Sequence, residues 1–274
     1  MRLHIRHVTN YRYDDPVAYS IQQLRLTPRP DPNQQILKWH LSTPGHPRSQ
    51  TDAHGNTVHT LVLSRPHQEI SLVVEGEVET RDGITLLPRG NGLSPLAYVA
   101  ASPQTTADEE IEALARKHLA PNGKPPGRDA FMRLMQGVRE SIAYQPGITD
   151  VTHTAIEAMS LGQGVCQDQA HVFVACCRAC AIPARYVSGY LLTDEEHAAS
   201  HAWVDAWLDD ENAWISCDVT HGRFADGHFC RLAVGRDYLD AGPVRGMRNG
   251  GNREEMRVNV AVKETPEAIF ALQQ

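Results

Sequence analysis

The period of the hydrophobic pattern changes along this 274-residue chain, and that change constrains the fold more than any other feature. Over roughly the first 90 residues apolar and polar side chains alternate, as in Ile36–Leu41 and Thr57–Leu63. A period of two, broken by Gly, Pro, Asn and Asp, is typical of strands. Residues 1–95 are therefore predicted to form an all-β module, either a sandwich or a barrel-like sheet.

The segment Leu87–Pro103 is rich in proline and glycine and is predicted to be a linker. After it the hydrophobic pattern has the period of a helix. Apolar residues three and four apart then predict three helices and the start of a fourth, at 108–119, 128–142, 154–161 and from Cys166. Strand patterns return at 185–192, 202–208, 213–217 and 257–262. Helices followed by strands predict an α+β domain over residues 105–274, with its helices packed on an antiparallel sheet.

Composition narrows the classes of function. The net charge of −7 argues against a nucleic-acid binder, which usually carries a basic face. The N-terminus has no apolar stretch of signal-peptide length, and no apolar run is long enough to span a membrane. Six cysteines are too few and too clustered for a disulfide framework. We therefore expect a cytoplasmic protein with reduced thiols and no membrane partner.

Cys166 is the candidate nucleophile. It follows Gly162-Gln163-Gly164-Val165 and begins the predicted helix whose apolar stripe continues at Ala170 and Phe173. The partial positive charge at a helix N-terminus favours the thiolate form of such a side chain. The backbone N–H of Cys166 has no acceptor within the helix and is available to bind an oxyanion. A lone cysteine at a helix start is also an ordinary small buried residue, so the assignment depends on partners.

The partners come from a predicted hairpin, Ser200–Leu208 and Ala213–Asp218, around the polar turn 209–212. A tight turn centred on Asp209 and Asp210 predicts a register in which His201 lies directly opposite Asp218. Directly opposed residues of an antiparallel pair have Cβ atoms about 4.5–5.5 Å apart, which lets an imidazole bond a carboxylate. His201 is therefore the candidate general base, and Asp218 is the candidate residue that orients it.

These three residue types suit the cleavage of an amide. The cysteine attacks the carbonyl carbon, the histidine transfers protons to and from the reacting groups, and the aspartate fixes the imidazole tautomer. No cofactor and no metal ion are expected. A zinc site is disfavoured because its four candidate thiols lie partly inside one helix and partly on separate elements, namely Cys177, Cys180, Cys217 and Cys230.

Four segments resemble the bacterial transglutaminase-like proteins: Gly164–His171, Ile182–Tyr190, Ser200–Val204 and Gly235–Tyr238. The resemblance covers roughly residues 125–262. It implies a papain-like α+β core in which Cys166, His201 and Asp218 form the catalytic triad, preceded by the family's β module. The chain departs from the family after the aspartate, where it reads Asp-Val-Thr-His-Gly instead of Asp-Pro-Thr-Asn-Gly. The departure keeps the carboxylate and changes the loop that follows it.

Supporting residues and the outcome of the reaction stay open at this point. Gln163 and Tyr144 are candidates for a second oxyanion donor, and Asp168 either supports the site or caps the helix start. A thioester resolved by water makes the protein a peptidase or isopeptidase, and one resolved by an amine makes it a true transglutaminase. Hydrolysis is favoured because water is always present and no EF-hand-like calcium loop occurs. A catalytically inert protein that binds a peptide or protein is the alternative from another class.

Overall fold

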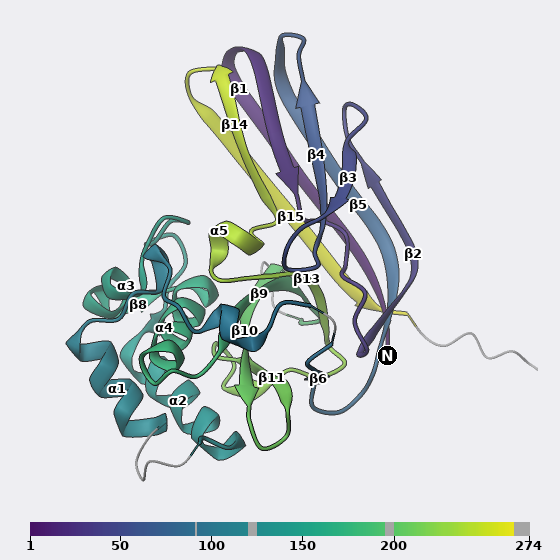
Figure 1. The fold of residues 1–274 in the computed structure, drawn as a ribbon. Coiled ribbons are helices and arrows are strands. Elements are labelled where there is room, and N and C mark those ends of the chain that lie inside the picture. Colours follow the sequence, from purple (N-terminus) through teal and green to yellow (C-terminus); the bar gives the residue numbers. More distant parts are fainter. Residues whose placement is uncertain (91, 120–124, 195–199, 266–274) are drawn as a thin grey trace, which may run out of the picture.

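The computed structural model describes residues 1–90, 92–119, 125–194 and 200–265. Figure 1 shows an elongated module of long strands standing on a second half, in which helices gather on one side of a shorter sheet. Both halves have the predicted character, so the α+β class with an all-β module at the N-terminus is confirmed.

The module is one seven-stranded antiparallel sheet curled around its longest strand, β1. The strand order is β2-β5-β1-β4-β3, with β14 and β15 also paired to β1. The bounds are β1 (Arg2–Leu24), β2 (Gln34–Ser42), β3 (Arg48–Thr51), β4 (Thr57–Leu63), β5 (His67–Thr80), β14 (Val244–Gly250) and β15 (Glu254–Glu264). Alternate side chains of β1 such as Leu3, Ile5 and Tyr13 are buried, which explains the period of two in the sequence.

The last two strands of the chain belong to this sheet. β15 runs antiparallel to the first half of β1, with Tyr13 opposite Glu254, and β14 pairs with the second half. The prediction that the strand at 257–262 belongs to the second domain is wrong, because β15 pairs with β1. Alternation identifies a strand and its buried face, but the partner of a strand is decided by the tertiary fold.

The second sheet lies next to the helices and has the order β12-β11-β10-β9-β13, with β6 added on β11. The bounds are β6 (Leu86–Pro88), β9 (Ala184–Leu191), β10 (Ser200–Leu208), β11 (Ala213–Asp218), β12 (Arg223–Phe224) and β13 (Phe229–Gly235). The predicted linker is therefore structured, since β6 extends the sheet and Tyr98 packs edge-on against Trp214. Prolines and glycines mark this segment as irregular without showing that Leu87 and Tyr98 within it are buried.

Helices form at the predicted places: α1 (Glu109–Leu119), α2 (Arg128–Ser141), α3 (Ala155–Leu161) and α4 (Cys166–Ala179). The short elements are α5 (Tyr238–Ala241), the 3-10 turns η1 (Pro95–Tyr98) and η2 (Pro103–Thr105), and the parallel pair β7 (Ala143–Tyr144) and β8 (Gln163–Gly164). α4 is the central helix, with every residue from Gln167 to Arg178 buried. Contacts with β9 and β10 on one side and with the other helices on the other side cause this burial. No helix in the described part of the chain is long and apolar enough to cross a membrane.

The module contacts the second sheet at its outer strand, β13. The side-chain amide of Gln34 donates to the carbonyl of Arg231 and accepts from the Arg231 N–H, both at 2.8 Å. The amide of Asn56 makes the same pair of bonds with Val234, at 2.7 and 2.9 Å. Two side chains thus satisfy backbone groups that a further strand would otherwise satisfy, and they close the sheet edge.

Candidate active site

The hairpin that carries His201 and Asp218 forms, but its register differs from the predicted one. Leu208 lies opposite Ala213 and Val204 lies opposite Cys217, so the loop has four residues instead of two. Asn212 closes that loop in the left-handed region, at φ +48°, with its N–H bonded to the carbonyl of Asp209. His201 and Asp218 are therefore not directly opposed. The shift is two residues, so both side chains stay on one face of the sheet.

The two side chains still meet, diagonally across the strands. Nε2 of His201 lies 2.9 Å from Oδ1 of Asp218. The Cys166 side chain is close enough to the same imidazole to raise its pKa. Because Nε2 faces Asp218, Nδ1 is the nitrogen left for Cys166. The structure thus brings together the three residues that the sequence singled out, with the imidazole between the thiol and the carboxylate.

Burial and charge act in opposite directions on this group. Burial by itself lowers the pKa of His201, but hydrogen bonds and charge interactions with Asp218 and Cys166 outweigh it and raise that pKa well above its ordinary value. Burial also favours the neutral form of Asp218, yet hydrogen bonds from two histidines hold the pKa of that carboxyl well below its ordinary value. Both directions favour an imidazolium beside a carboxylate.

The start of α4 is held by Asp168. Its Oδ2 accepts the backbone N–H of Val165 and the hydroxyl of Thr149, both at 2.7 Å, so the carboxylate caps the helix that Cys166 begins. Gly164 makes room for this contact, because a Cβ there would lie 2.6 Å from the same oxygen. The capping role weighed for Asp168 is therefore present, and it holds the backbone of Val165, the residue before Cys166.

The two candidates for a second oxyanion donor lie on the short strand pair next to Cys166, which joins residues 143–144 to residues 163–164. Tyr144 on β7 is opposite Gly164, and Gln163 is opposite Ala143 in the same short parallel pair. Both side chains are exposed. The N–H of Gln145, just after β7, donates to the carbonyl of Gly164 on β8 at 2.7 Å. This bond holds the two strands together just before Cys166. Their role as oxyanion donors stays a prediction.

His221 stands where the chain departs from the family motif, and the sequence predicts no role for it. Nδ1 of His221 lies 2.6 Å from Oδ2 of Asp218, and its ring centroid is 5.2 Å from that of His201. The carboxylate of Asp218 therefore receives an imidazole on each oxygen. The spacing Asp-x-x-His in a turn is the signal from which this contact could have been expected.

The same three residues have the spacing of a metal-ligand set. In the described part of the chain, ligand atoms of His201, Asp218 and His221 all lie within 4.8 Å of one another. Two imidazoles and a carboxylate are ligands that suit zinc. Each oxygen of Asp218 already accepts a hydrogen bond from an imidazole, so a metal ion would have to displace both bonds. The arrangement fits a hydrogen-bonded triad better than a metal centre.

The remaining cysteines differ from Cys166 in position and environment. Burial raises the pKa of the thiols of Cys176, Cys177, Cys217 and Cys230, all of which are buried. Cys180 is partly exposed like Cys166 but follows the C-terminal end of α4, and burial raises its pKa as well. Cys166 alone among these six stands at a helix N-terminus beside a histidine.

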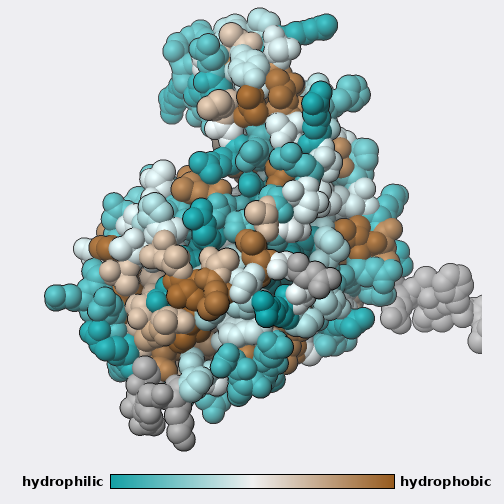
Figure 2. Space-filling view, viewed as in Figure 1, coloured by the Kyte–Doolittle hydropathy of each residue, from teal (hydrophilic) through white to brown (hydrophobic). Residues whose placement is uncertain are grey.

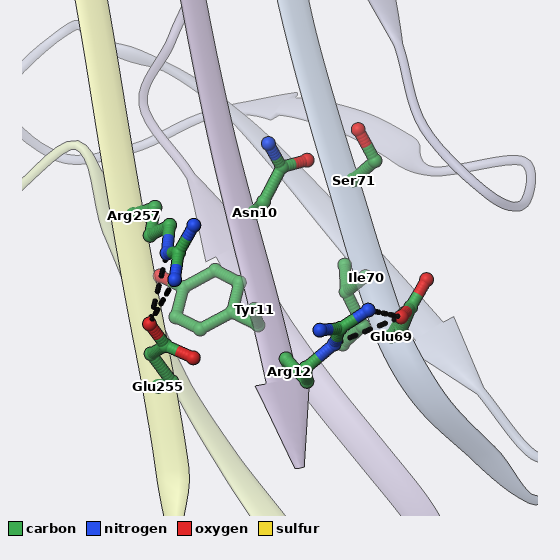
Figure 3. Close-up of a pocket in the computed structure, with 8 residues that line it drawn as sticks. All are labelled: Asn10, Tyr11, Arg12, Glu69, Ile70, Ser71, Glu255 and Arg257. Atoms are coloured by element: carbon green, nitrogen blue, oxygen red, sulfur yellow. Dashed lines mark hydrogen bonds and ion pairs between the residues drawn. The ribbon is translucent and has the colours of Figure 1, made fainter.

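Two cavities elsewhere are poor candidates for the chemistry. On the polar face of the module, a hollow of about 260 Å³ is lined by β1, β5 and β15. Figure 3 shows that its charged side chains already pair, Arg12 with Glu69 and Arg257 with Glu255. A larger cavity, of about 690 Å³, has Ile182 in its lining. Ile182 follows the C-terminal end of α4, so the length of that helix, about 20 Å, separates it from Cys166 at the other end. Figure 2 shows apolar side chains gathered on the helical half of the molecule.

Comparison with known proteins defines the fold class first. A protein from Cytophaga hutchinsonii, provisionally described as a cysteine protease, has a crystal structure that matches over 97% of this chain and 91% of its own, with a TM-score of 0.76 and 21% identity. That match shows a shared fold. Two family models also match: the bacterial transglutaminase-like N-terminal region over residues 3–79 and the transglutaminase-like superfamily core over residues 113–219. The chain belongs to the bacterial transglutaminase-like family.

Two relatives of similar length match nearly the whole chain. A Mycobacterium leprae protein is 29% identical over 95% of this chain and 98% of its own length. A Mycobacterium tuberculosis protein is also 29% identical, over 97% of this chain and 93% of its own length. Both are uncharacterised, so they extend the family without naming a substrate.

Proposed function

We propose that this protein is a cysteine-dependent amide acyl-transfer enzyme that hydrolyses peptide or isopeptide bonds through a thioester. The observation that carries the proposal is the imidazole of His201, which bonds Asp218 through Nε2 and lies beside Cys166. A peptide or protein is the proposed substrate. The six free cysteines fit a reducing compartment, for which we propose the cytoplasm.

The first half-reaction forms the acyl-enzyme. The Cys166 thiolate attacks the carbonyl carbon of the amide, and the developing oxyanion binds the backbone N–H of Cys166 at the start of α4. The His201 imidazolium gives its Nδ1 proton to the leaving nitrogen, so the C–N bond breaks and a neutral amine departs. Asp218 keeps the ring oriented through its bond to Nε2.

The second half-reaction releases the acyl group from Cys166. Neutral His201 accepts a proton from water as the water oxygen attacks the thioester carbonyl. The C–S bond breaks, the carboxylic acid leaves, and the thiolate and imidazolium are regenerated. A primary amine in place of water would give a new amide, which is the reaction of a true transglutaminase. Hydrolysis is the first choice because water needs no dedicated entry groove.

Selective alkylation tests whether Cys166 is activated. Cys180 is a matched control because it is also partly exposed and follows the opposite end of the same helix. With iodoacetamide at neutral pH, Cys166 is expected to react much faster than Cys180, and Cys180→Ser should leave the fast phase intact. Equal rates for the two thiols would favour the inert binding protein.

Trapping the intermediate tests the reaction itself. Mass spectrometry of the protein mixed with a peptide library should detect an acyl group on Cys166, and Cys166→Ala should lose it. Decay of that adduct is then compared in buffer alone and with added lysine. Faster decay and an amide product with lysine would replace hydrolysis by transamidation, whereas no adduct with any peptide would argue against the enzyme.

A further inference from the structure

The turn after Asp218 places a second imidazole on the catalytic carboxylate. Asp218 ends β11, and residues 219–222 turn the chain back into β12, with the N–H of Gly222 bonded to the carbonyl of Val219. Gly222 has φ +64°, a conformation that glycine adopts easily. The turn brings His221 over the strand end, where its N–H approaches Oδ1 of Asp218 at 3.3 Å and its Nδ1 lies 2.6 Å from Oδ2.

This turn is also anchored to the helix that carries the nucleophile. The hydroxyl of Thr220 donates to Oε1 of Gln169 on α4 at 2.8 Å, and Nε2 of Gln169 donates to the carbonyl of Ile142 at 3.0 Å. Gln169 is buried. The position of His221 is thus fixed relative to Cys166, three residues before Gln169 on the same helix. A merely solvated surface histidine would not need such an anchor.

We propose that His221 is a positioning residue, which locks the carboxylate of Asp218 so that Oδ1 faces His201. This inference rests on the proposed function, because it concerns the orientation of the imidazole beside Cys166. Asp218 is fully buried, so a carboxylate oxygen that loses a donor there is poorly compensated by water. Without the bond to Oδ2 the carboxyl group is free to turn, and the imidazolium that stabilises the Cys166 thiolate loses a fixed partner.

The chemistry of the side chain suggests a sharp set of variants. Nδ1 of histidine is bonded to Cγ, and so is the amide nitrogen of asparagine, so His221→Asn keeps a donor near the same point. His221→Gln moves the donor one bond further from the backbone, and His221→Ala removes it. His228 supplies a matched control, since its Nδ1 lies 2.8 Å from Asp226 in a pair that is partly exposed.

Alkylation by iodoacetamide tests the proposal without knowledge of the substrate. His221→Ala and His221→Gln are expected to slow labelling of Cys166 roughly tenfold, the effect of losing one hydrogen bond to a charged group. His221→Asn should restore most of the rate, and His228→Ala should leave it unchanged. With p-nitrophenyl acetate as a generic acylating ester, the loss should appear in kcat and not in KM.

The results separate this proposal from the proposed function. Wild-type rates in folded His221→Ala and His221→Gln, or a His221→Asn variant as slow as His221→Ala, would overturn the positioning role alone. Thermal unfolding shows which variants fold, and if His221→Ala does not fold, the comparison of Gln with Asn decides the question. A wild-type Cys166 no more reactive than Cys180 would instead remove the activated thiol on which both proposals depend.

Discussion

Replacing Gln34 by alanine is expected to destabilise the whole protein, although Gln34 lies far from Cys166 in the chain. Its buried side chain donates to the carbonyls of Arg29 and Arg231 and accepts from the N–H of Arg231, each at 2.8 Å. The last two bonds close the edge of the sheet that carries His201. Alanine would leave the Arg231 N–H without that acceptor.

The magnitude follows from these three bonds. A neutral hydrogen bond contributes about 1 kcal/mol net, and a buried donor left unpaired costs about 1–3 kcal/mol. We therefore expect Gln34→Ala to lower the free energy of unfolding by about 3 kcal/mol. A domain is typically stable by about 5–15 kcal/mol, so the loss would be a large share of the total.

Gln35 provides the control, because it follows on the same strand, points to the other face and is exposed. Urea denaturation should show a clearly lower midpoint for Gln34→Ala at an unchanged slope, and a change within about 0.5 kcal/mol for Gln35→Ala. If Gln34→Ala unfolds at the wild-type midpoint, the bonds of Gln34 to Arg231 do not stabilise the sheet edge.

Three further changes have expected outcomes. Burial lowers the pKa of His7 from 6.5 to about 4, so the unfolded chain binds a proton that the folded chain excludes. Stability should therefore fall as the pH drops below about 6.5. Urea denaturation at pH 7 and at about pH 4.5 should show a smaller drop in His7→Gln, and equal drops would contradict this. Asp205→Asn removes a fully buried carboxylate that pairs with two arginines and should cost about 3–5 kcal/mol, visible as a lower Tm. Gly164→Ala should displace the Asp168 cap and slow alkylation of Cys166, whereas Gly92→Ala, with open space around it, should not.

Local periodicity was sufficient to place most elements of this chain. The helices at 109–119, 128–141 and 155–161 begin and end within a residue or two of their predicted limits, because their apolar faces and end residues are local features. The proximity of Cys166, His201 and Asp218 was also predictable, since Cys166 begins a helix and the other two share one strand pair, while their catalytic role stays a prediction. Their motifs carry the family resemblance as well.

Other features depended on contacts between distant segments. The strand at 257–262 was predicted from the sequence and the strand at 244–250 was not, and only the folded module shows that β1 is the partner of both. The register of the hairpin was missed because the four-residue loop with a left-handed Asn212 cannot be told from a shorter one by alternation alone. The prediction that His201 meets Asp218 survived because an error of two residues keeps the same face.

The sequence by itself thus determined the chemistry available to this protein: a thiol at a helix start, and an imidazole and a carboxylate on neighbouring strands. These are properties of residue type and period, which a chain carries before it folds. Tertiary structure decided that the module closes the edge of the sheet carrying His201 through Gln34 and Asn56, and that the turn holding His221 is anchored to α4. These contacts depend on directional hydrogen bonds between segments far apart in the sequence, which hydrophobic patterning does not encode.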